Sequence, residues 1–575
     1  MQRDNMSAYI KGMDISSYPE VMDKGFSYFD YDGKKVDLLD FAVEQGINYG
    51  RLRLWNEPKE VPESGGYCDL EYTKQMAKEL TDRGMKFMLD FHYSDWWADP
   101  GQQTIPKAWK DLSDNELVQA VYDFTREVLE ELEANDTYPD SVQIGNEIRC
   151  GMMWPAGRIS NWPMLARLIN AGIRAVRDTQ KERKTQVVIH LDQGGRYYYL
   201  EEWFDTAIAH GVTDFDVIGL SYYPFWHGTF HDIKNSMEKL VDRYKKPIML
   251  TEIAHAYRRS AGSLFGEQQE KNAGFPANPK AQRKVLELIM SIVANVKDGM
   301  GMGVFYWEPF SRSEEDDGSW GSCMGVVDAQ GIPTEGCRAF GLDVTKVNGD
   351  ATAKIYEPAE LLLSSDADLQ LYLPQSIKVL TWNGNLENKE VFWKNVPLKG
   401  TLPEGGELVL EGEIPSEATT VQQIVRIEKE GMNYIKNGDF SDDLADWQLD
   451  ATGMTESSIR LEIAEEYPYG TENYFYFESK ENFQMKLSQK MIGLESGRYI
   501  LSAQYKGDNT TGVKVLLYAE AEGKKDIAEI FPTDREWRLC ELPLEVVNGK
   551  DWEIGLLVDS PAIYGKLRRV VLKRI

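Results

Sequence analysis

"SVQIGNEI", residues 141–148, is a short apolar run that ends in an amide and a carboxylate. Buried strands usually end in turn residues such as Gly, Pro or Asp, which suit the conformation of the backbone. The pair Asn146 and Glu147 at the end of this run has no such backbone reason. A chemical role is the alternative explanation.

Seven further runs of this kind lie in the first 340 residues, with amphipathic stretches between them. Ser113 and Glu116 form a capping box before one such stretch, and residues 162–178 and 281–298 also have helical spacing. Eight strand–helix units predict a closed (β/α)8 TIM barrel, and no Gly-rich dinucleotide fingerprint favours an open sheet. The other expected strands are residues 9–16, 49–55, 86–95, 186–194, 216–224, 247–257 and 301–310.

Polar side chains follow every expected strand. The carboxyl ends of barrel strands share one face, where active sites are built. Eight such strand ends in succession predict a lined pocket. The residues are Asp14, Arg51, Arg53, His92, Asp95, Asn146, Glu147, His190, Asp192, Tyr222, Tyr223, Glu252, His255, Trp307 and Glu308.

The composition excludes several classes of protein. With 93 acidic against 64 basic residues the net charge is −29, which would repel nucleic acid. No stretch approaches the roughly 18 apolar residues of a membrane span. Five scattered cysteines without a C-x-x-C pair argue against a disulfide framework and a zinc site. The 15 Trp and 29 Tyr suit flat amphipathic partners such as sugars.

The pattern changes beyond about residue 345. Short alternating runs between Gly and Pro turns, without helical stretches, predict all-β sandwich domains. We therefore expect an α/β barrel domain over residues 1–345, a spacer sandwich over 346–430 and a second sandwich over 431–575. The last domain is rich in aromatic residues, namely Trp447, Tyr467, Tyr469, Tyr474, Tyr476, Tyr505, Tyr518, Trp537 and Trp552.

Glu147 and Glu252 are the candidate catalytic pair. Each closes an expected buried strand, where partial desolvation raises the pKa of a carboxyl group. Strands four and seven of a barrel lie nearly opposite each other, so the two side chains should face across the pocket. One acid can then protonate a leaving oxygen while the other carboxylate attacks a sugar carbon, and a separation of about 5–5.5 Å gives retention of configuration. Two unrelated glutamates are the structural alternative.

The strand-end motifs resemble one family over roughly residues 8–342. "GMDIS", "RLRLWNEP", "DFHYSDWWADPGQQTIPKAW", "VQIGNEI", "IHLDQGG", "FDVIGLSYYPFWHG", "TEIAHAY" and "GVFYWEP" are similar to glycoside hydrolase family 53, the endo-β-1,4-galactanases of clan A. The resemblance implies retaining hydrolysis of β-1,4-galactan or galacto-oligosaccharides. Another clan A β-glycanase, of the mannanase or glucanase type, and a non-catalytic glycan-binding protein are the alternatives.

The resemblance also implies roles for individual residues. Glu147 is the acid/base, Glu252 the nucleophile, and Asn146 the partner of the sugar 2-hydroxyl. Arg51 should pair with Glu252, although Arg51 or Arg53 could pair instead with Asp14 or Asp90, and Tyr222 or Tyr223 should donate to the nucleophile. Residues expected to bind substrate, each with a structural alternative, are Asp14, His92, Asp95, Trp96, Asp99, Trp154, His190, Asp192, Trp226 and Trp307.

No organic cofactor is expected, and calcium is possible but not implied. Bacterial members often hold calcium between the loops after strands seven and eight. Here the first loop carries two arginines and no aspartate, while the second carries Glu314, Glu315, Asp316 and Asp317, which a solvated acidic loop also explains.

The regions after the barrel resemble appended modules of glycosidases. Residues 358–428 are similar to bacterial immunoglobulin-like spacers, and the segment that begins "NGDFSDDLADW" is similar to galactose-binding-like jelly-roll modules. A carbohydrate-binding module is therefore expected at the carboxyl end. The oligomeric state is open. So is the location, which is extracellular if a signal peptide was removed and cytoplasmic if Met1 is the native start.

Overall fold

The computed structural model describes residues 9–261, 264–313, 315–358, 360–365, 369–399, 401–402, 406–428, 433–440, 443–452, 459–466, 470–479, 482–508, 513–531, 537–547, 550–560 and 563–574. The chain divides into two compact units. The first comprises residues 1–354 and 380–387, and the second comprises 355–379 and 388–575. Of the residues singled out from the sequence, Glu314, Tyr467 and Tyr469 lie outside the described residues.

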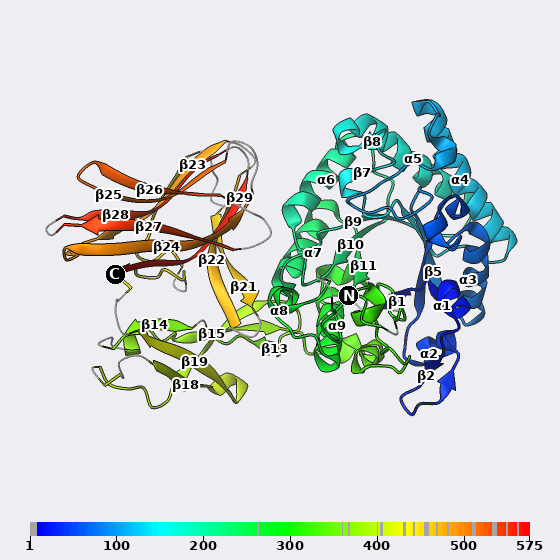
Figure 1. Ribbon diagram of the computed structural model, residues 1–575. Coiled ribbons are helices and arrows are strands. Elements are labelled where there is room, and N and C mark those ends of the chain that lie inside the picture. Colours follow the sequence, from blue (N-terminus) through cyan, green and yellow to red (C-terminus); the bar gives the residue numbers. More distant parts are fainter. Residues whose placement is uncertain are drawn as a thin grey trace. The chain divides into compact units, whose positions relative to one another are not determined.

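The first unit is a closed barrel of eight parallel strands surrounded by helices (Figure 1). This confirms the predicted fold class. All eight expected strands form, and each pairs with its neighbour in chain order until the first pairs with the last. Their bounds are β1 Ile10–Asp14, β4 Tyr49–Leu54, β5 Lys86–Phe91, β6 Ser141–Ile144, β9 Gln186–Leu191, β10 Val217–Tyr222, β11 Ile248–Ile253 and β12 Gly301–Tyr306.

Helices and short hairpins connect the barrel strands. The predicted capping box is present, since the Glu116 carboxylate accepts from Ser113 N at 2.8 Å and α4 begins there. The helices are α1 Tyr18–Asp23, α2 Leu38–Glu44, α3 Leu70–Asp82, α4 Asp114–Ala134, α5 Trp162–Thr179, α6 Tyr197–Ala209, α7 Phe230–Tyr244, α8 Glu267–Ala273, α9 Pro279–Ala294 and α10 Trp320–Cys323. The hairpin strands are β2 Tyr28–Phe29, β3 Lys35–Val36, β7 Gly151–Met152 and β8 Gly157–Arg158.

Side chains fill the barrel in layers, because alternate residues of each strand point inward. The lower layer is an apolar cluster of Ile10, Tyr49, Met88, Val188, Val217, Met249 and Phe305. Two residues further along β4, β5 and β9 come Arg51, Asp90 and His190, all fully buried. The apolar layer therefore supports a polar layer, which lies closer to the carboxyl ends of the strands.

An irregularity in β11 changes which of its side chains faces the barrel interior. Leu220 of β10 pairs with Leu250, but the next residue, Ser221, pairs with Glu252. Thr251 is thus an extra residue in β11, as in a β-bulge. Regular alternation from Met249 would point Thr251 inward, whereas the bulge places the Glu252 side chain on the inner face.

The second unit consists of β-sheets, as expected for the sandwich domains. Its first part contains β14 Leu361–Ser364, β17 Phe392–Trp393, β18 Gly406–Ile414, β19 Thr419–Glu428 and most of β15 Ser376–Thr381 and β16 Leu386–Glu390. Strand β13 Thr352–Ile355 lies at the boundary, and all of it except Ile355 belongs to the first unit. The residues at the β15–β16 turn belong instead to the first unit. There Lys284 Nζ lies 4.0 Å from the centre of the Trp382 ring.

The last part of the chain contains two five-stranded sheets, ordered β20-β23-β28-β25-β26 and β21-β22-β29-β24-β27. One large cluster, which includes Phe475, Leu501 and Leu556, packs between them. Trp447, Tyr474, Tyr476, Tyr505, Tyr518 and Trp552 are buried. The strands are β20 Gln448–Thr452, β21 Ile459–Glu466, β22 Gly470–Glu478, β23 Phe483–Met491, β24 Gly497–Gly507, β25 Lys514–Ala521, β26 Lys524–Ile530, β27 Arg538–Val546, β28 Trp552–Ser560 and β29 Tyr564–Arg574.

None of the helices in the described ranges combines the length and the hydrophobicity needed to cross a lipid bilayer.

Candidate active site

A cavity of about 540 Å³ lies at the carboxyl ends of the barrel strands. This volume is within the usual range for a pocket that takes a small ligand. Both glutamates of the predicted pair are among its walls. The lining residues are Trp97, Ala98, Asp99, Pro100, Asn146, Glu147, Arg149, Asp192, Gln193, Tyr223, Trp226, His227, Glu252, Trp307 and Trp320.

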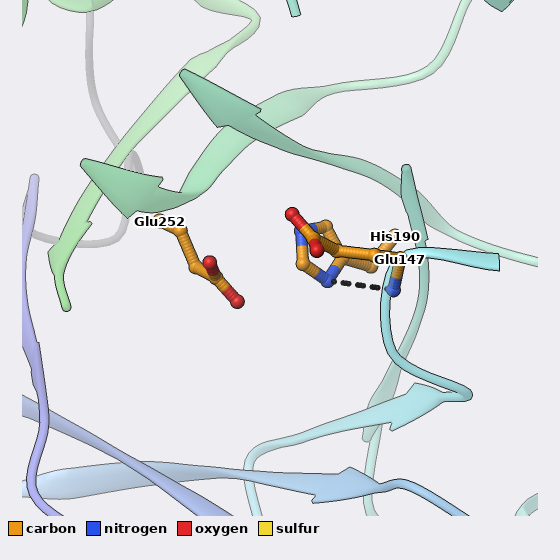
Figure 2. Close-up of side chains that lie close together, drawn as sticks. All are labelled: Glu147, His190 and Glu252. Atoms are coloured by element: carbon orange, nitrogen blue, oxygen red, sulfur yellow. Dashed lines mark hydrogen bonds between the residues drawn. The ribbon is translucent and has the colours of Figure 1, made fainter. Parts of the chain in front are cut away.

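Glu147 and Glu252 face each other across this cavity (Figure 2). One carboxylate oxygen of each lies within 4.8 Å of the other. Glycosidases that retain configuration hold their two carboxyl groups about 5–5.5 Å apart, and inverting ones about 6.5–9.5 Å apart. The close approach of these two oxygens fits the shorter spacing, that of a pair in which one carboxylate attacks the sugar directly.

Two donors hold the Glu252 carboxylate. Arg51 Nη1 donates to Oε1 at 3.0 Å and the Tyr223 hydroxyl donates to Oε2 at 2.9 Å. Burial raises the pKa of Glu252 to about 7, and the charges of Asp14 and Asp90 add to this rise. Arg51 and Tyr223 act in the opposite direction, because they favour the ionised carboxylate. Glu252 is thus a desolvated carboxyl group whose charged form is favoured by a cation and a phenol, which oppose the effect of burial.

Glu147 has different partners. It follows β6 with a left-handed backbone at φ 47°, a conformation that a non-glycine residue adopts at some cost. Ser221 Oγ donates to its Oε1 at 2.5 Å, and within the described ranges no Lys, Arg or His forms an ion pair with it. Burial and the negative charges of Glu252 and Asp192 raise the pKa of Glu147 well above its usual value. Glu147 is therefore the member of the pair that retains its proton.

Arg51 connects most of the polar layer. Besides Glu252 it donates to Asp14 at 3.1 Å, Asp90 at 2.9 Å, Asn146 Oδ1 at 2.8 Å and Gln143 Oε1 at 3.2 Å. The two predicted alternatives, pairing with the nucleophile or with Asp14 and Asp90, are thus both present. A buried guanidinium uses all its N–H groups in this way because an unpaired one would be costly.

Arg53 does not contact Glu252. It pairs with Glu308 at the end of β12 and lies 3.7 Å from Asp14. Its guanidinium carbon lies 4.2 Å from the centre of the Trp97 ring and 5.5 Å from the centre of the Trp307 ring. Arg53 therefore supports the tryptophans of the cavity wall.

Asn146 has its amide orientation fixed by its neighbours. Its Oδ1 accepts from Arg51, and its Nδ2 donates to the Ala98 carbonyl at 2.9 Å. Gln143 lies on β6, three residues before Asn146. Its Nε2 donates to Asp90 at 2.6 Å and lies 3.2 Å from Asn146 Oδ1. The Nδ2 group, which carries two hydrogens, is thus placed at the cavity wall beside Glu147.

The structure distinguishes the two tyrosines of β10. Tyr223 contacts Glu252, whereas the Tyr222 hydroxyl donates to the Gly228 carbonyl at 3.2 Å and its ring packs on Phe230. Inward alternation runs through Val217, Gly219 and Ser221 to Tyr223, so Tyr222 points to the outside of the barrel.

Four residues predicted to bind substrate lie in the cavity wall. Trp307 and Trp226 present indole rings, and Trp226 has an exposed fraction of 43%. Asp99 accepts from backbone N–H groups of its own loop, including Gly101 N at 2.7 Å. Asp192 accepts from Arg149 Nε at 2.8 Å.

Six residues predicted to bind substrate lie outside this lining. His92 accepts from Trp55 and from Ala98 N and contacts Asp90, so all its polar atoms are used within the protein. Asp95 accepts from Glu57 N and Lys107 N. These contacts indicate supporting roles for His92 and Asp95. The six residues outside the lining are Asp14, His92, Asp95, Trp96, Trp154 and His190.

Sequence reasoning missed several residues of the site. Trp97, Arg149, Gln193, His227 and Trp320 line the cavity. Gln143 and Ser221 lie behind the glutamates. Counting in steps of two along the strands would have found Gln143 and Ser221, since both are polar residues at inward positions of apolar runs. The loop residues Trp97 and Trp320 carry no such signal.

Two acidic residues of the loop after β12 have partners within the protein. Asp316 accepts from Ala261 N at 2.9 Å and lies 3.8 Å from Arg258, while Asp317 accepts from Ser319 N and Ser313. A guanidinium beside Asp316 does not suit a cation site. In the described part of the chain, only Glu147, His190 and Glu252 bring three potential ligand atoms together, and both ring nitrogens of His190 already have hydrogen-bond contacts.

Several known proteins are similar to this chain. A protein of Niallia circulans described as "Uncharacterized protein in bgaB 5'region" is 40% identical over 52% of this chain and 84% of its own length. The arabinogalactan endo-beta-1,4-galactanase of Cellvibrio japonicus is 35% identical over 64% of this chain and 94% of its own. The solved Ignisphaera aggregans GH53 catalytic domain is 34% identical with a TM-score of 0.54, covering 59% of this chain and 97% of that one. The model of glycosyl hydrolase family 53 matches residues 10–337, and the chain therefore belongs to this family.

Proposed function

We propose that this protein is a retaining endo-β-1,4-galactanase that hydrolyses β-1,4-galactan, with Glu252 as nucleophile and Glu147 as acid/base. The observation that carries the proposal is the pair itself, two buried carboxyl groups that have one oxygen each within 4.8 Å and different hydrogen-bond partners. Membership of glycosyl hydrolase family 53 and the named activity of the Cellvibrio japonicus relative support galactan as the substrate.

In the first step Glu252 attacks C1 of the sugar in the cavity. The C1–O bond to the leaving sugar breaks, its electron pair stays with the leaving oxygen, and Glu147 gives that oxygen its proton. The product is a glycosyl ester of Glu252 and a shortened chain with a free hydroxyl. Arg51 and Tyr223 keep Glu252 ionised for this attack.

In the second step water attacks C1 and Glu147 takes one of its protons. The ester bond breaks and its electrons return to Glu252 as a carboxylate. Two inversions at C1 leave the configuration unchanged. The raised pKa of Glu147 suits both parts of this cycle, since an acid/base works best when its pKa is close to the operating pH.

Asn146 and the tryptophans are assigned to substrate binding. The free hydrogen of the Asn146 amide is available to the 2-hydroxyl of the sugar, a contact that strengthens as charge develops at C1. Trp226 and Trp307 offer flat apolar faces for sugar rings, and Asp99 and Asp192 offer acceptors for sugar hydroxyls.

The test is product analysis with purified polysaccharides. Lupin or potato galactan should release galacto-oligosaccharides, whereas mannan and cellulose should release none. Proton NMR of the first minutes of reaction should show the β-anomer before mutarotation. Release from mannan or cellulose alone would favour another clan A glycanase, and no release from any glycan would favour a binding protein.

The carboxyl-terminal sandwich is proposed to be a carbohydrate-binding module, and residues 346–430 a spacer. The resemblance of the segment that begins at Asn437 to galactose-binding-like modules supports the first role. Retention of the protein on insoluble galactan would be compared with retention of a chain that ends at residue 430. Equal retention of the two would contradict a binding role for residues 431–575.

A further inference from the structure

Two buried residues behind Glu147 form a hydrogen-bonded chain that the mechanism above does not use. His190 Nε2 lies 2.8 Å from Ser221 Oγ, and Ser221 Oγ lies 2.5 Å from Glu147 Oε1. His190 comes from β9 and Ser221 from β10, and neither side chain is exposed. Figure 2 shows the imidazole directly behind the Glu147 carboxyl group.

The neighbours of His190 decide which ring nitrogen carries its proton. Glu147 N and Gln143 Nε2 both approach Nδ1, at 3.4 Å and 3.1 Å. The oxygen and nitrogen of the Gln143 amide cannot be exchanged, since Oε1 accepts from Arg51 Nε at 3.2 Å. Two N–H donors therefore face Nδ1, and the Glu147 N–H has no other acceptor within the described ranges. A buried N–H without an acceptor is costly, so Nδ1 accepts and the proton lies on Nε2.

One contact of His190 Nδ1 would instead favour a proton on Nδ1. Asn146 Oδ1 is an acceptor and lies 3.0 Å from the same nitrogen. Oδ1 already accepts from Arg51 Nη2 at 2.8 Å, so it does not need a proton from the ring. The assignment of the proton to Nε2 satisfies every donor at this junction.

The direction of the chain follows from this assignment. Burial and the nearby charge of Arg51 lower the pKa of His190 well below its usual value, so the ring is neutral. Its Nε2–H then donates to Ser221 Oγ, and the Ser221 hydroxyl has its own hydrogen left for Glu147 Oε1. A hydroxyl that accepts on one side donates on the other.

We propose that His190 and Ser221 are positioning residues that keep Glu147 Oε1 as a hydrogen-bond acceptor throughout the reaction, so that the proton exchanged with substrate is always carried on Oε2. The inference rests on the proposed role of Glu147 as acid/base. Oε1 accepts from Ser221 both in the carboxylic acid and in the carboxylate. The Oε2 proton passes to the glycosidic oxygen in the first step and is replaced by a proton of water in the second. The protons of His190 and Ser221 stay where they are.

Several other groups also influence the ionisation of Glu147. Glu252 of β11 and Asp192 after β9 raise its pKa, Arg51 of β4 lowers it, and Tyr223 after β10 lies in the same cavity. All of these remain in a Ser221→Ala variant. A change in the pH profile of that variant therefore reports the loss of the hydroxyl, which stabilises the charged form of Glu147.

The experiment compares two leaving groups in the Ser221→Ala variant of the full chain. Phenyl β-1,4-galactobioside needs protonation of its leaving oxygen, whereas the 2,4-dinitrophenyl compound does not. We expect kcat/KM for the phenyl substrate to fall about tenfold to hundredfold, the cost of a misplaced catalytic group. The dinitrophenyl substrate should lose less than about threefold, since general-acid help is not required there. The basic limb of the phenyl profile should move up by about one pH unit.

Controls separate a folding defect from a positioning defect. Active sites are counted by trapping Glu252 with a 2-deoxy-2-fluoro dinitrophenyl galactobioside, a reaction that needs no acid, and all rates are divided by that count. Equal losses for both leaving groups, with the basic limb unmoved, would overturn the inference. His190→Gln retains a neutral N–H donor and should keep more of the phenyl rate than His190→Ala. Equal losses in these two variants would show that His190 does not orient Ser221.

Failure of the proposed function has a different signature. Glu147→Ala should show the same dependence on the leaving group as Ser221→Ala, but more strongly. If Glu147→Ala slows both substrates equally, Glu147 is not the acid/base and the proposed mechanism fails. If Glu147→Ala discriminates and Ser221→Ala does not, only the inference about Ser221 and His190 fails.

Discussion

Glu147 and Glu252 approach within 4.8 Å across the cavity, yet among the residues that the structure describes only Glu252 is paired with a cation, through Arg51 at 3.0 Å. Two equal carboxyl groups at this distance would share one proton without a preference. Arg51 and Tyr223 remove the equality, because they stabilise the charge on Glu252, whereas the donor to the Glu147 carboxyl group within the described ranges is the Ser221 hydroxyl. The difference between the two carboxyl groups is set by these neighbours rather than by the glutamates themselves.

Glu252→Ala should lower kcat on galactan by at least about a thousandfold, since the nucleophile acts as a unit with the acid/base and its loss stops the first step. The measurement is release of reducing sugar by wild type and variant at equal concentration. With the 2,4-dinitrophenyl galactobioside, whose leaving group needs no acid, azide added to Glu147→Ala should restore turnover and give the β-glycosyl azide, because azide then attacks the intermediate on Glu252. Equal rates of wild type and Glu252→Ala would contradict the proposal that Glu252 is the nucleophile of a glycoside hydrolase.

Tyr223→Phe should raise the pKa of Glu252 further and move the acidic limb of kcat/KM to higher pH. The phenol stabilises the ionised carboxylate, and a lost hydrogen bond of this kind corresponds to about one pH unit. A pH profile of kcat/KM measures the shift.

Tyr222→Phe is the matched control, since Tyr222 is the adjacent tyrosine and donates to the Gly228 carbonyl. Its profile should coincide with that of wild type, with at most about 1 kcal/mol lost in stability. A shifted profile in this variant, or none in Tyr223→Phe, would show that the wrong tyrosine has been assigned.

Glu252→Gln should stabilise the protein at pH 8 relative to wild type and have less effect at pH 5. The folded-state pKa of about 7 exceeds the unfolded value of 4.5, so the unfolding free energy of wild type falls as the pH rises from about 4.5 to 7. The difference should be about 1–3 kcal/mol, an amount set by the size of this shift. Denaturant unfolding at both pH values measures it.

Arg51 makes this comparison possible, because Asp14 and Asp90 still pair with it in the Glu252→Gln variant. Arg51→Gln is the contrasting change. It leaves buried carboxylates without their cation and should destabilise the fold by about 3–5 kcal/mol. If Glu252→Gln lowers the unfolding free energy equally at pH 5 and pH 8, the raised pKa of Glu252 is contradicted.

Removal of calcium with a chelator should leave both Tm and galactan hydrolysis unchanged. Arg258 lies beside Asp316, where the loops after β11 and β12 meet, and a fixed cation there competes with a bound ion. Thermal unfolding with EDTA and with millimolar calcium measures the effect. A Tm that rises with calcium and falls with EDTA would show a site that these contacts do not explain.

The sequence by itself determined the barrel, the order of its strands and the choice of Glu147 and Glu252 as the candidate catalytic pair. Period-two and helical patterns are local, and the strand ends of a parallel barrel necessarily share a face. Glu147, Glu252, Asn146, Arg51 and Trp307 could therefore be placed at one site from their positions along the chain.

The tertiary structure decided what each of these residues contacts. The extra residue Thr251 turns Glu252 inward, a shift that no hydropathy pattern records. The choice of Tyr223 over Tyr222, and the burial of His92 and His190 behind the cavity, depend on side chains from different strands. Contacts of this kind join residues far apart in sequence, and their geometry follows from packing within a few tenths of an ångström rather than from local preference. For this reason the sequence could identify the two glutamates as candidates. It could not predict that the Ser221 hydroxyl donates to Glu147 rather than to Glu252.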